Sequence, residues 1–377
     1  MRRFFFCVVK KMQRKPPDAA AVVSVVLSVL LLGILALLPK NVSQNLLLLS
    51  AYAALPEGGA AKLRTFVTQA AEPEHTSVSV PEKKAPLSSD ALTDTPEDVL
   101  EWMRKAQENA SSQRKDGDIR EQTFGKKSST ESFRNLLIRN LTDDVHPDYA
   151  ALWDADAPLS IDKSEPAVLI FHTHTTEGFE LLDRDWYAAD TTSRTTDTSR
   201  NVARVGTAIA EELERAGFRT LHDMTVHDEA YSGAYDRSRK TVEPYLEKYP
   251  NLSVVLDVHR DAIQENDGTK IKPVATINGK KAAQIMIISG AQGGKAADFA
   301  NWKENLRFAL RLQDACETQA PGLTRPIFFC HRKYNMDMTP CSLLVEFGSE
   351  ANTLEEAVYA GRLFGRALAN LLEQYVR

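Results

Sequence analysis

Two histidines and a glutamate follow directly after a short apolar segment of this 377-residue chain. Residues 168–171 are apolar throughout, which is typical of a strand buried on both faces. His172, His174 and Glu177 lie at or just past the end of that strand. Ligands of open α/β sheets bind beyond the carboxyl ends of the strands, and zinc prefers imidazole and carboxylate ligands. The segment therefore predicts a metal site at the edge of a sheet.

Two later apolar segments carry residues of the same kind. His259 follows one apolar run, and Glu346 interrupts another. In a parallel sheet these strand ends meet at one edge. A catalytic zinc needs three protein ligands and an open position for water, and one of the two earlier histidines, Glu177 and His259 would supply the ligands. Glu346 would then be the general base that takes a proton from water.

The residues of the first segment leave alternatives open. His172 and His174 are two apart, so on an extended backbone they face the same way, and either or both could bind the metal. Glu177 could instead orient a histidine from behind the metal. The segment therefore predicts the type of site and leaves open which of its residues bind the metal.

The later residues have alternatives of their own. His259 could be a buried structural histidine, and Glu346 could pair with Arg260, since a carboxylate in an apolar strand needs a partner. His222 and His227 are expected at the surface or at the rim of a pocket. None of these alternatives removes the cluster at the three strand ends.

Strands and helices alternate through the C-terminal part of the chain. The expected strands are 167–171, 218–222, 252–258, 274–277, 283–288 and 342–347, and the expected helices are 199–216, 239–249, 302–320 and 354–375. Asn278-Gly279 is a hairpin signal between the fourth and fifth strands. The alternation predicts an α/β fold, with a mostly parallel or mixed sheet and helices on both faces.

The N-terminal region has a different composition. The first 17 residues hold six of the 46 basic residues and no acid, so the rest of the chain carries a formal charge of −11. That balance argues against nucleic acid as the main partner. Residues 19–38 form a long apolar run without a charge, which predicts a transmembrane helix. The basic residues on the N-terminal side of this run would place residues 1–18 in the cytoplasm and the chain after residue 38 outside. Cleavage of the apolar segment, as in a signal peptide, is the alternative.

The remaining organisation follows from composition. Residues 39–132 are expected to be an extracytoplasmic linker or stalk, and residues 133–377 the catalytic domain. A short helix could start at Thr95-Pro96 within the linker. No CxxC pair is present, so a cysteine-based zinc site is not expected. One disulfide, such as Cys330 to Cys341, is compatible with the expected export.

Five blocks along the chain, followed by Asn352, resemble the stage II sporulation protein P family. They are His172-Thr-His-Thr-Thr-Glu177, Asn201-Val-Ala-Arg-Val-Gly206, Asp257-Val-His-Arg-Asp-Ala262, Tyr334-Asn-Met-Asp337 and Leu344-Val-Glu-Phe-Gly348. Members of that family are membrane-anchored cell-wall hydrolases of endospore-forming bacteria. The resemblance covers residues 133–377 and the anchor, and implies localisation at the cell membrane.

The same blocks resemble the wider zinc-dependent N-acetylmuramoyl-L-alanine amidase fold. In that comparison the first histidine ligand corresponds best to His174. The glutamate ligand of that fold lies near the start of the following helix, where this chain has Asn201, so Glu177 is the natural replacement. Arg260 would contact the oxyanion or a carboxylate of the stem peptide.

The resemblance also implies a substrate and partners. The expected reaction is cleavage of the amide between N-acetylmuramic acid and L-alanine of peptidoglycan, with cutting of peptide cross-links as a further activity. The expected partners during engulfment are a lytic transglycosylase, stage II sporulation protein D, and a membrane anchor protein, stage II sporulation protein M. Another zinc peptidase of the wall, or a non-catalytic wall-binding protein, are the alternatives.

Overall fold

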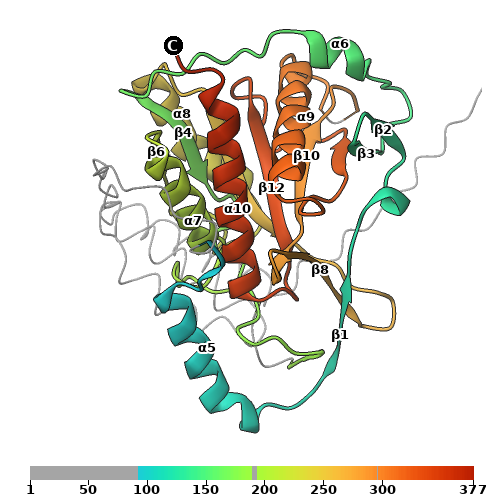
Figure 1. Cartoon of the computed structure of the whole chain (residues 1–377), viewed down its shortest axis with the longest axis vertical. Coiled ribbons are helices and arrows are strands. Elements are labelled where there is room, and N and C mark those ends of the chain that lie inside the picture. Colours follow the sequence, from blue (N-terminus) through green and yellow to red (C-terminus); the bar gives the residue numbers. More distant parts are fainter. Residues whose placement is uncertain (1–91, 189–192, 295) are drawn as a thin grey trace, which may run out of the picture. The chain divides into compact units, whose positions relative to one another are not determined.

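The computed structural model describes residues 92–188, 193–294 and 296–377 (Figure 1). The described residues all belong to one compact unit. The expected cytoplasmic segment, the transmembrane helix at 19–38 and the first part of the stalk lie outside the described residues. Within the described ranges, no helix has the length and apolar character needed to cross a membrane.

The larger of two sheets has eight strands in the order β2-β3-β11-β10-β12-β7-β4-β6. Their bounds are β2 Glu131–Phe133, β3 Leu136–Asn140, β4 Pro166–Phe171, β6 Arg219–His222, β7 Val254–Asp261, β10 Ile285–Gly290, β11 Ile327–Cys330 and β12 Ser342–Ser349. All neighbours are parallel except β10 with β12 and β2 with β3. The mixed, mostly parallel sheet of the prediction is confirmed.

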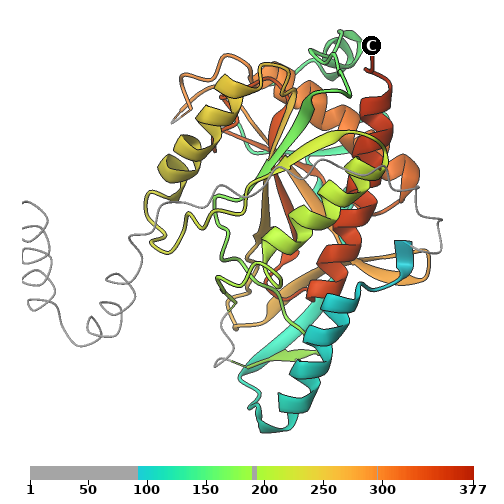
Figure 2. The ribbon, with the colours of Figure 1, turned by 90° about the vertical axis from the view of Figure 1, so that its left-hand side faces the viewer.

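Helices cover both faces of this sheet (Figure 2). The helices are α6 Tyr149–Asp154, α7 Val202–Arg215, α8 Ala234–Lys248, α9 Trp302–Gln319 and α10 Leu354–Glu373. Side chains of α7, α9 and α10 share one hydrophobic cluster with alternate strand residues such as Val168 and Val345. Val242 of α8 packs instead against Leu169 and Val255, whose side chains point to the opposite face. The expected helices on both faces are therefore present.

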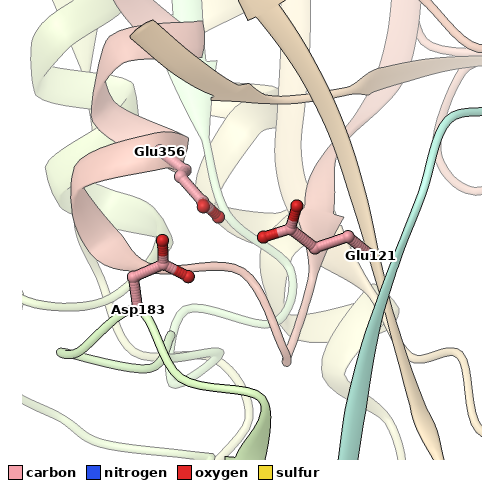
Figure 3. Close-up of side chains that lie close together, drawn as sticks. All are labelled: Glu121, Asp183 and Glu356. Carbon is pink, nitrogen blue, oxygen red and sulfur yellow. The ribbon is translucent and has the colours of Figure 1, made fainter.

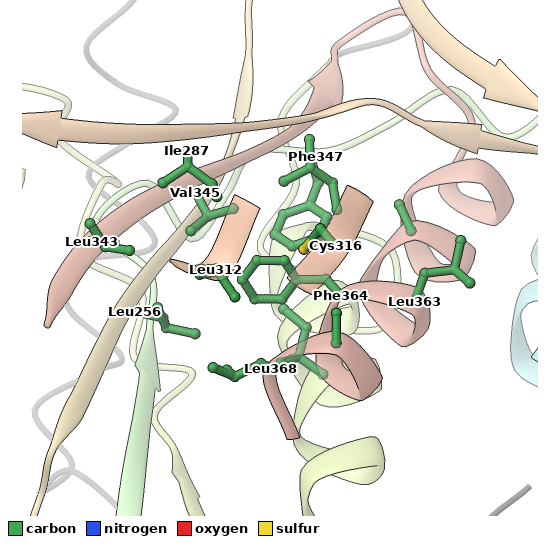
Figure 4. Packing of buried hydrophobic residues seen from close by; sticks show 14 of the residues in the cluster. Leu256, Ile287, Leu312, Cys316, Leu343, Val345, Phe347, Leu363, Phe364 and Leu368 are labelled. Carbon is green, nitrogen blue, oxygen red and sulfur yellow. The ribbon is translucent and has the colours of Figure 1, made fainter. Parts of the chain in front are cut away.

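The main core lies between β12 and α10 (Figure 4). Phe347 of β12 and Phe364 of α10 meet edge to face, with ring centroids 5.4 Å apart. Thr353 and Glu356 form a capping box that starts α10, which explains why the helix begins directly after the last strand. Gly365 allows α10 to approach α7, because a Cβ atom there would lie 2.9 Å from the carbonyl oxygen of Ile209.

A second sheet of four strands has the order β5-β1-β8-β9. Its strands are β1 Gly117–Gln122, β5 Trp186–Tyr187, β8 Lys270–Ile277 and β9 Lys280–Ala283. Asn278 and Gly279 both have positive φ, as a two-residue hairpin turn between β8 and β9 requires. The expected strand 283–288 corresponds to β10, which starts at Ile285 and lies in the other sheet. Its expected pairing with β8 through the hairpin is wrong, because β9 is the strand that pairs there. Gln284 marks that change of sheet, and its side chain bonds to the backbone of Phe124.

Folded structure begins earlier than the expected domain start at residue 133. The elements before it are α5 Glu97–Asn109, the short 3₁₀ helices η1 Ala110–Ser112 and η2 Lys126–Ser128, strand β1 and most of β2. The expected linker is therefore wrong from residue 92 onward. β1 is polar and buries only Ile119, and backbone pairing with β8 holds it in place. A strand held by pairing rather than by apolar side chains gives no signal in hydrophobic periodicity.

The cysteines of the described residues are not paired. Cys316, Cys330 and Cys341 are all buried with free thiols. The Cys330–Cys341 disulfide considered from the sequence is therefore not formed in this structure. Burial among apolar side chains raises the pKa of the Cys330 thiol to about 11, so it stays protonated at neutral pH.

Candidate active site

The three strand ends singled out in the sequence lie side by side. β4, β7 and β12 are parallel neighbours, with Phe171 opposite Asp257 and Glu346 opposite His259. Each element therefore delivers its polar residue to the same edge of the sheet. After Glu346 the register with β7 shifts, and Gly348 has a φ of 66°. The convergence expected from the sequence is present.

His259 lies between two carboxylates. Its Nε2 atom is 2.7 Å from Oδ1 of Asp257, and its Nδ1 atom is 3.4 Å from Oε2 of Glu177. Burial alone would lower the pKa of His259, but Asp257 and Glu177 raise the pKa well above its usual range. Asp257 also accepts hydrogen bonds from the backbone N–H and the hydroxyl of Thr173, at 2.8 and 2.7 Å. Asp257 thus ties the segment after β4 to the imidazole of β7.

Glu177 is buried and ionised. Its Oε2 atom accepts a bond of 3.2 Å from the backbone N–H of Arg260, and its Oε1 atom lies 3.4 Å from Arg194. Burial alone would raise the pKa of Glu177, but the imidazole of His259 and the charge of Arg260 lower it to about 2. A carboxylate held in its charged form beside a histidine is suited to bind a cation.

His174 faces His259 across the site. The two rings are 5.3 Å apart and nearly perpendicular. Tyr231 stacks on His174 at 4.7 Å, and Tyr235 contacts the same ring edge to face at 5.6 Å. The Nδ1 atom of His174 is buried without a hydrogen bond, 3.7 Å from Oδ2 of Asp228. Burial and the neighbouring His259 lower the pKa of His174, which favours the neutral imidazole that metals bind.

Glu346 lies in an environment that favours uptake of a proton by its carboxylate. Its Oε2 atom is enclosed and makes no hydrogen bond. Burial first, then the negative charges of Asp261 and Glu177, raise the pKa of Glu346 to about 8. The considered pairing with Arg260 is absent from the ion pairs of the described residues. Its position opposite His259 in the sheet places the carboxylate beside the candidate ligands.

His172 is directed away from this cluster. Its Nδ1 atom bonds to the carbonyl of Val258 at 2.8 Å, and its Nε2 atom to Nε2 of His222 at 2.9 Å. The expectation that His172 and His174 face the same way is wrong, because β4 ends at Phe171 and the chain turns directly afterwards. Both ring nitrogens are engaged, so His172 is a buried structural histidine. Its partner His222 is not a rim residue.

Arg260 does not point its guanidinium at the cluster. Nε donates to the carbonyl of Gly178 at 2.9 Å, and Nη2 donates to the carbonyl of Ser193 at 2.8 Å. Nη1 donates to the carbonyl of Asp261 at 3.3 Å. Backbone carbonyls thus occupy the guanidinium in this arrangement, and the predicted substrate contact stays a prediction. Arg260 instead fixes the loop that carries Glu177.

Several residues around the site were not singled out from the sequence. Asp228 accepts hydrogen bonds from the backbone and hydroxyl of Thr176 and faces His174. Tyr231 and Tyr235 come from the segment after β6 and from the start of α8, and Tyr235 stacks on Tyr334 at 5.2 Å. Only Tyr334 was part of a recognised block. Asp228 and Tyr231 reach the site through the path of a loop, and Tyr235 through the position of α8 in the fold, and neither leaves a periodic signal in the sequence.

A group of three carboxylates elsewhere resembles a metal site by distance alone. Glu121, Asp183 and Glu356 are the one group of at least three His, Cys, Asp or Glu in the described residues whose ligand atoms lie within 4.8 Å (Figure 3). Lys272 Nζ already lies among them, at 2.9, 2.5 and 3.0 Å from the three carboxylates. The ammonium supplies the positive charge there, so we assign the group as an ion-pair cluster around a buried lysine, with Glu356 buried and Glu121 and Asp183 exposed.

The residues at the sheet edge fit zinc by type. His174, Glu177 and His259 are a nitrogen and oxygen set of three ligands. Nδ1 of His174 is buried and forms no hydrogen bond. Nδ1 of His259 faces Glu177, while Nε2 on the other side of the ring faces Asp257. Their ligand atoms are less tightly gathered than those around Lys272. Binding would therefore require a small approach of the side chains.

Comparison with known proteins identifies the family. The sequence model described as Stage II sporulation protein P (SpoIIP) matches residues 69–369. The chain belongs to the stage II sporulation protein P family. It is 30% identical over 213 residues to stage II sporulation protein P of Bacillus subtilis (strain 168), a match that covers 53% of this chain and 50% of that protein. The match thus spans about half the length of this relative.

Solved structures with some likeness to the chain include two amidases. The CwlD amidase of Clostridioides difficile, in complex with the GerS lipoprotein, is 10% identical, with a TM-score of 0.36 over 55% of this chain and 98% of that chain. The amidase Ami1 of Mycobacterium smegmatis is 13% identical, with a TM-score of 0.32 over 56% of this chain and 98% of that chain. At these scores the likeness adds nothing to the contacts described above.

Proposed function

We propose that this protein is a peptidoglycan hydrolase that cleaves the amide between N-acetylmuramic acid and L-alanine. The observation that carries the proposal is the convergence of His174, Glu177 and His259 beside Glu346 at one sheet edge, in a member of the stage II sporulation protein P family. Three ligands of this kind next to a carboxylate base are the parts of a metal-dependent hydrolase. Cutting of peptide cross-links is a further activity compatible with the same parts.

Zinc is the metal that this ligand set favours. A bound zinc ion would supply positive charge that polarises the amide carbonyl and makes a water molecule more acidic. His174, Glu177 and His259 would hold it, and Asp257 would keep His259 oriented. Hydrogen bonds from the partners behind a ligand fix its orientation and strengthen its basicity.

Glu346 moves the proton in this proposal. Its carboxylate accepts a proton from the attacking water and delivers it to the departing nitrogen of L-alanine. A pKa raised to about 8 suits that role, since a carboxylate of higher pKa takes up a proton more readily than an ordinary one. Arg260 contributes by fixing the Glu177 loop. Tyr231 and Tyr235 pack against the ring of His174 and so help to hold its orientation.

The cellular setting forms part of the proposal. We place the catalytic unit outside the cytoplasm, held at the cell membrane by residues 19–38, and assign it to wall degradation during engulfment. Peptidoglycan is then the macromolecular partner, with a lytic transglycosylase and a membrane anchor protein of the engulfment machinery as protein partners. The family membership and the apolar N-terminal run support this assignment.

Digestion of purified peptidoglycan tests the proposed reaction. We expect the zinc-loaded chain to release stem peptides with a new free amine on L-alanine, identified by mass spectrometry. Glu346→Gln should lower kcat by about 10²- to 10⁴-fold, the usual contribution of a general base. Glu243→Gln, an exposed glutamate on α8, is the matched control and should leave the rate unchanged.

Other products would separate the alternatives. New amines only at peptide cross-links would identify a wall peptidase instead of an amidase. Binding to the wall without release of any fragment, also after the glycan strands are cut beforehand, would indicate a non-catalytic wall-binding protein. Equal rates for Glu346→Gln and the unchanged chain would remove Glu346 from the mechanism.

A further inference from the structure

A charged cavity borders the loop that carries Glu177. Its volume is about 160 Å³, and its walls come from α5, from the segment after Glu177 and from the segment before α7. The charged side chains that line it are Glu180, Arg184, Arg200 and Glu350. A cavity of this volume has room for several water molecules or for one amino-acid residue. It is too small for a disaccharide, so a single residue of a peptide is the occupant to consider.

The cavity shares its backbone with the candidate active site. Gly178, which lines it, directly follows Glu177. Ser193 lines it too, and the carbonyls of Gly178 and Ser193 both accept hydrogen bonds from Arg260, the neighbour of His259. The candidate ligands Glu177 and His259 are therefore direct sequence neighbours of Gly178 and Arg260, whose hydrogen bond holds the cavity wall. A substrate bound at the ligands is within a few residues' reach of the cavity, since an extended peptide advances about 3.3–3.6 Å per residue.

Two guanidinium groups in the wall each keep an enclosed N–H without a hydrogen bond. Arg184 donates from Nη1 to Gln113 at 2.5 Å and from Nη2 to Glu180 at 3.3 Å, but its Nε makes no bond. Arg200 donates from Nη2 to Thr195 at 3.3 Å, and its Nε, 3.6 Å from Asp197, also makes no bond. Buried donors normally find an acceptor. A carboxylate is the acceptor that two guanidinium groups bind best.

Two carboxylates complete the charge pattern. Glu350 is 8% exposed, and its Oε2 atom accepts a single bond of 3.2 Å from the backbone of Ile263. Burial raises the pKa of Glu180, with Glu350 contributing as a nearby negative charge and Arg184 and Lys270 opposing it. An ammonium group would relieve the repulsion between the two carboxylates. The wall therefore offers partners for one negative and one positive group, and its balanced charge disfavours a polyanion.

We propose that this cavity binds the diamino acid residue of the peptidoglycan stem peptide. Arg184 and Arg200 would take its carboxylate, and Glu180 and Glu350 its side-chain ammonium. The choice of ligand rests on the proposed function, since the stem peptide continues from the L-alanine of the scissile amide and carries both groups. α5 forms one wall through Ala106, so the region before residue 133 contributes to substrate recognition.

Calorimetric titration of the full chain with the tripeptide L-alanyl-γ-D-glutamyl-meso-diaminopimelate tests the site without requiring cleavage. Arg200→Gln and Glu350→Gln should each weaken binding about tenfold or more, the effect of losing a hydrogen bond to a charged group. Glutamine at 350 can still accept the bond from Ile263, which protects the fold. Arg104→Gln and Glu108→Gln, exposed on α5, are matched controls and should change the affinity less than twofold.

A third variant fills the space without removing a charge. Ala106→Leu should also weaken binding tenfold or more, and it remains informative if Arg200→Gln does not fold. Acetylation of the side-chain amine of the tripeptide should weaken its binding to the unchanged chain but not further in Glu350→Gln. Such loss of additivity is the mark of a direct contact.

The outcomes for the cavity and for the proposed function are distinguishable. Tripeptide binding that depends on Arg200 and Glu350 supports the cavity whether or not the amide is cleaved. Cleavage of peptidoglycan with tripeptide binding that none of the three variants weakens would overturn the cavity and leave the amidase intact. Failure of the unchanged chain to bind the tripeptide at millimolar concentration would overturn the cavity as well.

Discussion

His172 and His174 are two residues apart and have opposite surroundings. We expect His174→Ala to abolish stoichiometric zinc binding, because its ring faces His259. His172→Ala should retain zinc but lower the free energy of unfolding by about 1–3 kcal/mol, since it leaves the Val258 carbonyl and His222 without their bonds. Metal content measured after gel filtration and urea unfolding would check both. A folded His172→Ala protein without zinc would reverse the assignment.

Asp257 acts on the site through His259 and Thr173. Asp257→Asn removes the charge that orients the imidazole and should weaken zinc binding about 10- to 100-fold, the usual effect of changing a group behind a ligand. Competition with a fluorescent zinc chelator would measure this affinity. Asp223→Asn is the matched control, since Asp223 is a buried carboxylate that bonds to Tyr245 and Thr225. Equal losses in both variants would indicate a general loss of structure.

The residues of the site differ in how far the sequence predicts them. The sequence predicts His259 and Glu346 because each interrupts or ends an apolar strand. The parallel pairing of these two strands then brings the residues together. The sequence does not decide between His172 and His174, because that choice depends on where β4 ends and the chain turns. Tyr231 was missed for another reason. It stacks on His174 from a segment more than fifty residues later, and such a contact depends on tertiary structure alone.

At the scale of elements, the contact between α7 and the end of β4 requires a small residue. A Cβ atom on Gly206 would lie 2.6 Å from Nε2 of His222 and 2.9 Å from the ring of His172. Alanine normally stabilises a helix interior by about 1 kcal/mol relative to glycine. Here we expect Gly206→Ala to destabilise the protein by about 1–3 kcal/mol through overpacking.

Thermal unfolding beside Thr207→Ala separates packing from helix propensity. Thr207 is the next residue of α7, is partly exposed, and bonds only to the carbonyl of Ala203 one turn earlier. Its replacement should be neutral or mildly stabilising. A stabilised Gly206→Ala protein would show that the two histidine rings can move aside, and would weaken the view that His172 is held rigidly.

The elements that the sequence predicts well are those with an apolar face of regular period. The expected helix 302–320 and the expected strand 342–347 agree closely with α9 and β12. β1 was missed because its partners are backbone groups of β8 and β5. The sequence also does not predict that β10 runs antiparallel to β12. A buried apolar segment has the same composition in either direction, and only the connections determine how the strands pair.

At the scale of the whole molecule, the region before residue 133 is part of the folded unit. Val99 and Leu92 are buried in the main core, and Asp98 forms an ion pair of 2.5 Å with Arg204 of α7. A fragment of residues 133–377 should therefore unfold at a lower temperature than residues 92–377. It should also bind a dye specific for exposed apolar surface. Equal melting temperatures would mean that residues 92–132 do not contribute to the stability of the folded unit.

Lys272 joins four parts of the molecule through buried charge. Its side chain is 1% exposed and lies between Glu121 of β1, Asp183 before β5 and Glu356 of α10. Removing one partner of a buried ion pair leaves an uncompensated charge, which costs about 3–5 kcal/mol. Lys272→Met should lower the free energy of unfolding by that amount at pH 7. Lys281→Met, which removes a 41% exposed lysine from the same carboxylates, should cost about 0–1 kcal/mol.

The pH dependence of that difference tests the cause. The lysines lower the pKa values of Glu121 and Asp183 despite their partial burial, so these groups stabilise the fold above their unfolded pKa and lose this contribution as the pH falls through the folded value. Burial raises the pKa of Glu356, and without Lys272 its carboxylate should take up a proton at still higher pH. Lowering the pH should therefore decrease the free energy of unfolding of the unchanged protein. In Lys272→Met it should remove part of the destabilisation, because the uncompensated carboxylates become protonated.

Urea unfolding from pH 8 to pH 4 would then show the gap between the unchanged protein and Lys272→Met narrowing as the pH falls. Adding Glu356→Gln to the variant should restore part of the stability at pH 7, because it removes the buried charge that Lys272 compensates. The double variant should also depend less on pH than Lys272→Met alone. A gap that stays constant over this range would mean that Lys272 stabilises the fold through the packing of its side chain rather than through its charge.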